Sequence, residues 1–498
     1  MPYFQRGGAD DSNSDGSIIR TSGAYRLCFQ VGRFVGSLVG LSCGEVASAN
    51  GVVRLSMACF ARFLTGKFLM LRCTVILFAM LFPCIALAAE PATKLAGIRI
   101  AADDWPWWRG PNRNGIANAD QMPPLEWSET RNVLWKAKVT GRGHGSATVV
   151  GDRVFLATAD HESQKQAVVC LHKDSGKQLW ETVVHQAGFP DANQKKSGGN
   201  EKASLASSSV ACDGTYVFIN FLNDKAVFTT ALTMDGEQVW QTKITDYVIH
   251  QGYGSSPTVY EDLVIVSADN KGGGAIAALD RATGDVVWER ERPSKPNYAS
   301  PAILNIDGRD QLLFTGCDLV TSLNPLTGEQ LWEMEGATTE CVTTTVTDGV
   351  RIFTSGGYPK NHISAVAADG SGKVVWENNV RTYVPSMLSQ DGLLYAIMDA
   401  GVAVCFNSET GEEVWKGRLA GTFSSSPVLV GDRIYVTNED GTTFVMKAGG
   451  TDFIKLASNQ LGDNVFSTPT ICGGRIYSRV AFVQDGIRQE YLYCIGEN

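Results

Sequence analysis

Residues 276–288 read IAALDRATGDVVW and predict a β-hairpin that ends in a large aromatic side chain. In its first half, the side chains of Ala277 and Leu279 point to one face of the strand and alternate with residues that point to the other face, as a half-buried strand requires. Asp280 can hydrogen-bond to its own turn backbone, and Gly284 can adopt the positive φ of a tight turn. A second strand then leads into Trp288. The stretch is therefore a hairpin with an aromatic anchor and not a helix.

Variants of this hairpin recur to the C-terminus. They end at Trp180, Trp240, Trp332, Trp376 and Trp415, and an isolated Trp135 precedes them. The tryptophans lie 39 to 60 residues apart. Such a period, built from strands and turns, is typical of a β-propeller with four strands per blade. A second pattern consists of small residues, then a turn, then β-branched residues. It occurs eight times, beginning at Gly145, Ser207, Ser255, Ala299, Cys341, Val384, Ser425 and Ser467.

The chain is thus predicted to be all-β, with an eight-bladed propeller over residues 131–498. The last repeat ends in EYLYCIGEN and has only three strands. We expect residues 132–139, which include Trp135, to supply its missing outer strand, so that the closed ring has no free edge. The seventh outer hairpin has Lys455 where a tryptophan is expected. Seven blades is the alternative if the weak last repeat is distorted.

Two segments at the N-terminus are interpreted as lying outside the mature fold. Residues 1–56 are rich in Gly, Ser and Asp without a sustained period, which favours a disordered or wrongly started leader. Residues 57–89 combine a basic flank with a short apolar run, CTVILFAMLFPCIALAA, that ends in small residues. This pattern predicts a cleaved secretory signal, with an uncleaved anchor as the alternative. We therefore expect an exported protein, periplasmic or extracellular, without a membrane span in the mature chain.

Residues 90–130 form a third segment, which contains the motif DDWPWWRGPNRNG at residues 103–115. Three tryptophans so close together can form a platform for a carbohydrate or a quinone. They can equally staple the N-terminus to the side of the propeller by burying their rings. The stapling role is the interpretation that we favour.

Composition limits the classes of partner. The formal net charge of −9 and the pI near 5.3 argue against nucleic acid and against an anionic membrane surface as the main partner. The seven cysteines that follow the apolar run show no CxxC pair and no spacing typical of metal ligands. We interpret them as buried strand residues and expect no metal site. A monomer is expected.

The repeat resembles that of the pyrroloquinoline-quinone (PQQ) propeller family. Its unit of a small residue, x, Asp, x, x, Thr-Gly and a later Trp matches residues 278–288, and the resemblance covers residues 131–498. The family includes quinoprotein alcohol dehydrogenases and non-catalytic outer-membrane assembly lipoproteins of the BamB type. The resemblance implies that the tryptophans dock one blade on the next, a role that falls on Trp135, Trp180, Trp240, Trp288, Trp332, Trp376 and Trp415.

Catalysis does not follow from this resemblance. Quinoprotein dehydrogenases carry adjacent cysteines near the cofactor and acidic and amide ligands for a calcium ion, whereas this chain has no Cys-Cys pair and no clear acidic cluster in one blade. We therefore expect a non-catalytic binding or scaffold protein for a protein or an envelope polymer, with no cofactor. The alternative is a dehydrogenase of alcohols or polymeric alcohols that uses PQQ with calcium.

Propeller topology predicts where a ligand would bind. The residues just before the inner strands share one face around the central channel, where mixed aromatic and charged groups can hold a small molecule or a peptide strand. A solvated channel mouth is the alternative interpretation. The candidates are His144, Lys202, Tyr253, Asn297, Tyr298, Glu340, Tyr383, Phe423 and Phe466.

Overall fold

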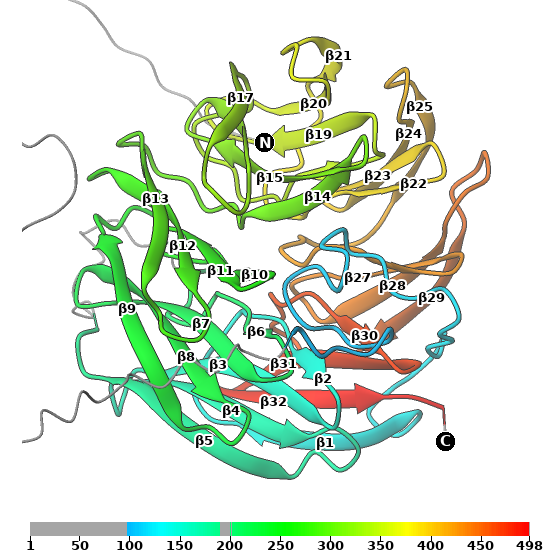
Figure 1. Ribbon diagram of the computed structural model, residues 1–498. Coiled ribbons are helices and arrows are strands. Elements are labelled where there is room, and N and C mark those ends of the chain that lie inside the picture. The colour runs from blue at the N-terminus through cyan, green and yellow to red at the C-terminus, as the bar shows by residue number, and fades with distance from the viewer. Residues whose placement is uncertain (1–96, 190–199, 201, 498) are drawn as a thin grey trace, which may run out of the picture. The chain divides into compact units, whose positions relative to one another are not determined.

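The computed structural model describes residues 97–189, 200 and 202–497, and the strands of this part form eight four-stranded antiparallel sheets around a common centre (Figure 1). The prediction of an eight-bladed all-β propeller is confirmed, and the seven-bladed alternative is wrong because the last repeat forms a complete sheet. The leader and signal predicted at residues 1–56 and 57–89 lie outside the described residues. In the described part, no helix is long and apolar enough to cross a membrane.

Each of the first four blades runs in sequence from its inner to its outer strand. Blade 1 contains β2 (Thr148–Val150), β3 (Arg153–Asp160), β4 (Lys165–His172) and β5 (Gln178–Gln186). Blade 2 contains β6 (Ala211–Cys212), β7 (Tyr216–Asn223), β8 (Ala226–Thr233) and β9 (Gln238–Asp246). Blade 3 contains β10 (Thr258–Tyr260), β11 (Leu263–Ser267), β12 (Gly274–Asp280) and β13 (Val286–Arg292). Blade 4 contains β14 (Ala302–Ile306), β15 (Arg309–Gly316), β16 (Leu319–Leu323) and β17 (Gln330–Glu335).

The last four blades continue around the ring. Blade 5 contains β18 (Val346–Thr347), β19 (Arg351–Gly356), β20 (His362–Ala367) and β21 (Val374–Asn378). Blade 6 contains β22 (Leu388–Gln390), β23 (Leu393–Met398), β24 (Val402–Asn407) and β25 (Glu413–Arg418). Blade 7 contains β26 (Val428–Val430), β27 (Arg433–Thr437), β28 (Thr442–Lys447) and β29 (Lys455–Gln460). Blade 8 contains β30 (Thr470–Cys472), β31 (Arg475–Gln484), β32 (Ile487–Ile495) and, as its outer strand, β1 (Val133–Val139).

Burial along the strands follows from the stacking of blades. Both faces of β12 are covered by neighbouring blades, so this strand is buried almost throughout. The outer strand β13 instead alternates between exposed and buried residues near its centre. Apolar side chains of adjacent sheets pack together between the blades, as in the cluster that blades 2 and 3 share. The core is therefore a ring of layers between blades and not one central core.

A ring of hydroxyl groups fastens the inner strands to one another. Each hydroxyl belongs to the residue two positions before an inner strand, and it accepts a hydrogen bond from the backbone N–H at the same position of the preceding blade. The accepting residues are Ser209, Ser256, Ser300, Ser386, Ser426, Thr468 and Ser146, at 2.9 to 3.1 Å. At the eighth such position, the Thr344 hydroxyl accepts a hydrogen bond from the Trp108 indole (2.8 Å).

The repeat tryptophans contact the turn of the next blade. Trp240 of blade 2 packs on Gly284 of blade 3, and its indole N–H donates to the Arg281 carbonyl (3.1 Å). Gly284 has φ +78°, and a Cβ there would lie 2.6 Å from the indole. The turn therefore requires glycine both for its backbone conformation and for the space beside the indole. The same packing pairs Trp135 with Gly176, Trp180 with Gly236, Trp288 with Gly328, Trp332 with Gly370 and Trp376 with Gly411. Trp415 packs against Phe453 instead.

Blade 7 lacks a tryptophan of its own. The strand register aligns Ala457, and not Lys455, with the position of Trp288 in blade 3. Trp127, from the segment before the propeller, stacks on Tyr435 of β27 at a centroid distance of 6.4 Å. Phe155 and Trp180 of blade 1 make the equivalent contact within their own repeat. The missing side chain of blade 7 is thus supplied from the N-terminal side of the chain.

Residues 97–131, which we call the N-terminal segment, cross the far end of the channel, where the inner strands end. Trp105 forms an antiparallel bridge with Val149 of β2, and Ile116 forms a parallel bridge with Leu429 of β26. Arg109 is 2% exposed, and its guanidinium donates to the carbonyls of Asn114, Met387 and Pro427. Arg113 donates to the Thr258 hydroxyl and the Val259 carbonyl of β10 in blade 3, across the ring from blade 7, so the segment connects opposite sides of the ring at this end.

Candidate functional site

A pocket of about 260 Å³ lies inside the channel, toward the end where the inner strands begin, which we call the rim. Nearest the rim, the pocket is lined by aromatic side chains that precede the inner strands. Below them lie hydroxyls of the fastening ring. The indole of Trp108 lies among these hydroxyls and forms the floor. The ring hydroxyls that line the pocket are those of Ser146, Ser209, Ser256, Ser300, Ser426 and Thr468.

Six of the nine candidate residues line this pocket: His144, Lys202, Tyr253, Tyr298, Tyr383 and Phe466. They come from blades 1, 2, 3, 4, 6 and 8, which the ring brings together. The other three candidates have different environments. Asn297 is buried and donates to Asp269 (3.1 Å), Glu340 is buried behind Tyr383, and Phe423 packs against Phe444.

Sequence reasoning missed Trp108 as part of the site. The motif WPWW drew attention to this segment, but nothing local separates the three rings. Trp105 and Trp107 are buried among the blades, at 3% and 4% exposure, whereas Trp108 is only partly buried and faces the pocket. The signal that distinguishes them is the partner of Trp108, Thr344, which lies 236 residues away.

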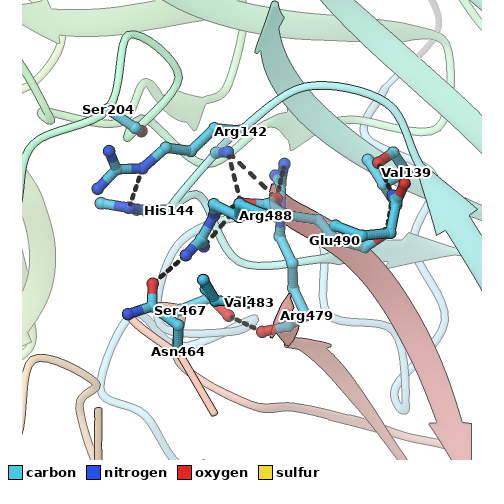
Figure 2. A network of polar contacts seen from close by, with 12 residues as sticks. Val139, Arg142, His144, Ser204, Asn464, Ser467, Arg479, Val483, Arg488 and Glu490 are labelled. Carbon is cyan, nitrogen blue, oxygen red and sulfur yellow. Dashed lines mark hydrogen bonds and ion pairs between the residues drawn. The ribbon is translucent and has the colours of Figure 1, made fainter. Parts of the chain in front are cut away.

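Basic side chains support the wall between blades 8 and 1 (Figure 2). Arg479 Nε and Arg488 Nη2 donate to the Glu490 carboxylate at 2.7 and 2.8 Å. His144 Nε2 accepts from Arg142 Nε at 3.4 Å, which requires that nitrogen to be unprotonated. Burial, and then the charge of Arg142, lower the pKa of His144 well below its ordinary value. His144 therefore faces the pocket as a neutral ring.

The wall on blades 4 to 6 contains a buried carboxylate. Glu340 is 3% exposed, accepts from the Tyr383 hydroxyl at 3.0 Å and lies 3.2 Å from His250 Nδ1. The Tyr298 hydroxyl lies 3.1 Å from the same nitrogen. Burial, and then the charge of Glu340, raise the pKa of both Tyr298 and Tyr383. The two phenols consequently remain neutral and present their rings to the pocket.

Lys202 is the one ammonium group among the lining residues, and it is paired. Its Nζ lies 2.6 Å from Glu439 Oε2, and the same carboxylate accepts from the Ser424 hydroxyl at 2.6 Å. With His144 neutral and Glu340 behind the tyrosines, the lining among the described residues offers no unpaired charge to a ligand. The site is neutral and consists of hydroxyls, amides and aromatic rings.

These residues do not fit PQQ held with calcium. Calcium prefers carboxylate and carbonyl oxygens, and no Asp or Glu side chain lines the pocket within the described part of the chain. The seven cysteines of that part are buried, and none of them lines the pocket. No group of three or more His, Cys, Asp or Glu side chains in residues 97–189 and 202–497 is arranged to hold a metal ion.

Comparison with known proteins identifies a family whose model matches this chain. The model for the family described as "Outer membrane protein assembly factor BamB" matches residues 125–183, 164–358 and 359–451. The protein of that name from Burkholderia pseudomallei is 25% identical over 386 residues, covering 73% of this chain and 90% of the relative. A polyvinylalcohol dehydrogenase from Sphingopyxis sp. is 27% identical over 223 residues, covering 40% of this chain and 31% of that protein.

Two solved structures are similar in fold. BamB from Moraxella catarrhalis gives a TM-score of 0.50 at 16% identity, covering 72% of this chain and 96% of that one. The quinohemoprotein alcohol dehydrogenase from Comamonas testosteroni gives 0.57 at 14% identity, covering 80% and 81%. The propeller thus occurs in assembly factors and in enzymes alike. Because the family model matches well over half of the chain, this protein belongs to the family of PQQ-like repeat propellers described by the BamB assembly-factor model.

Proposed function

We propose that this protein is an exported, non-catalytic binding or scaffold protein of the cell envelope. The observation that carries the proposal is the family match, whose named relatives are assembly factors similar over most of both chains. The pocket lining supports it, because no Asp, Glu or Cys side chain lines the pocket among the described residues, and its two basic side chains, His144 and Lys202, are engaged by Arg142 and Glu439. The rim around the pocket is the surface that we assign to the partner.

Chemical cross-linking in the native envelope tests this function. The tagged full chain should capture a reproducible set of envelope proteins or polymers. Capture should fall in Lys202→Glu and Arg381→Glu, which change exposed charges at the rim, where Arg381 stacks on Tyr383. Lys243→Glu on the outer strand β9 is the matched control, since this lysine is also exposed but lies outside the pocket lining. A capture profile equal to that of an untagged strain would contradict the proposal.

The alternative, a quinoprotein dehydrogenase, has one observation in its favour, the local similarity to polyvinylalcohol dehydrogenases. Titration with PQQ and calcium followed by thermal unfolding separates the two functions. A ligand that binds only the folded state raises the midpoint by mass action, so a dehydrogenase would be stabilised by the pair. The scaffold function predicts an unchanged midpoint and no dye-linked oxidation of alcohols.

A further inference from the structure

We propose that the central pocket binds one neutral sugar ring, either free or at the end of a glycan chain, with Trp108 as its floor. The inference rests on the proposed function and names the ligand class of the same site. The pocket is small. Pockets for drug-sized ligands span roughly 300 to 1,000 Å³. At about 260 Å³, this pocket is the right size for a ligand of about one ring.

The charged groups of the lining are already paired. A charged ligand would need an unpaired group of opposite sign, because desolvating an ion without a partner is costly. Lys202 is paired with Glu439, and Glu340 is held by Tyr383 behind the wall. His144 accepts a hydrogen bond from Arg142 and is neutral. A neutral ligand is therefore the one that the lining accommodates without such a cost.

The ring of hydroxyls retains hydrogen-bonding capacity for a ligand. The six that line the pocket each accept one backbone N–H, and in the described part of the chain none of the six donates its own hydrogen to a protein acceptor. All six residues are more than nine-tenths buried. Each hydroxyl thus keeps a donor hydrogen and a lone pair for a ligand. A polyhydroxylated ring, whose own hydroxyls both donate and accept, satisfies such groups.

The floor of the pocket is an aromatic ring with a fixed orientation. The Trp108 indole donates to Thr344, which fixes its orientation, and the ring is the least buried of the three in its motif. The face of an aromatic ring carries negative potential, and the C–H bonds of a pyranose are weakly positive, so the two pack favourably. Tyr298, Tyr383 and Phe466 supply further aromatic surface above the floor. A sugar ring combines one apolar face, which suits the aromatic floor, with a polar edge, which suits the hydroxyls.

Fluorescence titration of the full chain tests the inference. The neutral probes are methyl glycosides of glucose, galactose, mannose and N-acetylglucosamine, and linear trisaccharides of the same sugars; citrate and benzoate are the anionic probes. We expect at least one glycoside to bind saturably, with affinity unchanged by about 0.5 M salt, because no ion pair forms. In a ligand-observed NMR titration, which does not depend on the removed indole, Trp108→Leu should weaken binding about tenfold, the loss expected of one aromatic contact. Trp127→Phe, in the same segment but away from the pocket, is the control and should bind normally.

Each outcome decides the question. Binding of trisaccharides supports the proposal and assigns the end of a glycan chain, whereas binding of methyl glycosides alone supports it and assigns a free sugar. Binding of the anionic probes only, or of no probe by wild-type protein in a ligand-observed NMR assay, overturns it. Cross-linking on the same samples keeps the two proposals apart, because partner capture without sugar binding overturns this inference alone.

Discussion

Blades 3 and 7 have the same four strands, yet they obtain the aromatic side chain that packs over the blade in different ways. In blade 3, Trp288 belongs to the outer strand of its own repeat. In blade 7 that position holds Ala457, and Trp127 reaches it from the N-terminal segment. The Trp127 backbone N–H also donates to Asn459 Oδ1 of β29 (2.9 Å), 332 residues away. A regular blade is therefore a local structure, whereas closure of the ring depends on contacts between distant parts of the chain.

The largest expected effect comes from removing the N-terminal segment. Deleting residues 97–131 removes four tryptophans, three of which are buried, together with the buried Arg109. Since each buried aromatic contributes about 3 to 5 kcal/mol, the free energy of unfolding should fall by more than about 5 kcal/mol. Urea denaturation measures this change. Met122→Ala, at a side chain that is 64% exposed in the same segment, should leave stability unchanged and serves as the control.

Single tryptophan substitutions sharpen the comparison between the blades. Trp288→Ala and Trp127→Ala should each lower the free energy of unfolding by about 3 to 5 kcal/mol, because both rings are buried against neighbouring elements. Val287→Ala, at an exposed neighbour of Trp288, is the matched control. A Trp127→Ala loss of under about 1 kcal/mol would show that the N-terminal ring does not replace a repeat tryptophan.

A pair of glycines isolates the docking contact itself. Gly284 and Gly308 both have positive φ, at +78° and +73°, but only a Cβ on Gly284 would strike an indole, that of Trp240. Backbone strain is therefore common to the two alanine variants, whereas overpacking, which costs about 1 to 3 kcal/mol, affects only Gly284→Ala. Gly284→Ala should be less stable than Gly308→Ala by about 2 kcal/mol in thermal or urea unfolding. Equal losses would mean that the turn can move away from the ring.

The last expected effect is a dependence of stability on pH. Burial lowers the pKa of His362 to about 4, from an ordinary value of 6.5. The unfolded state then binds more protons between these values, so stability is complete above about pH 6.5 and is lost as the pH falls toward 4. His362→Gln should flatten this fall in urea unfolding, whereas His161→Gln, at an exposed histidine, should not. Equal slopes in wild type and His362→Gln would contradict the assignment.

The blades could be predicted from the sequence because each repeat carries its own pattern of strand, turn and tryptophan. Outer strand β1 was predictable as well, since Trp135 marks it and the last repeat lacks one strand. The roles of Trp108 and Trp127 were not, because no period marks them and their partners lie hundreds of residues away. The aligned residue in blade 7 is Ala457 and not Lys455 because the turn between β28 and β29 is two residues longer than the turn between β12 and β13.

The site shows the same limit. Loop positions before the inner strands converge on the pocket, which topology alone indicates. Neighbouring residues in extended chain point in opposite directions, so Tyr298 lines the pocket while Asn297 turns into the polar cluster around Asp269. Sequence spacing does not resolve this choice. Nor does it reveal that Glu439 neutralises Lys202, an ion pair between blades 2 and 7.

The central claim is that the N-terminal segment is a structural part of the propeller and forms the floor of its pocket. Hydrogen–deuterium exchange of the full chain tests it directly. The backbone N–H groups of Trp105 and Ala117 donate to carbonyls of β2 and β26, so they should exchange as slowly as those of the inner strands. Exchange of these two amides at the rate of an unstructured peptide, with the blades still protected, would contradict the account.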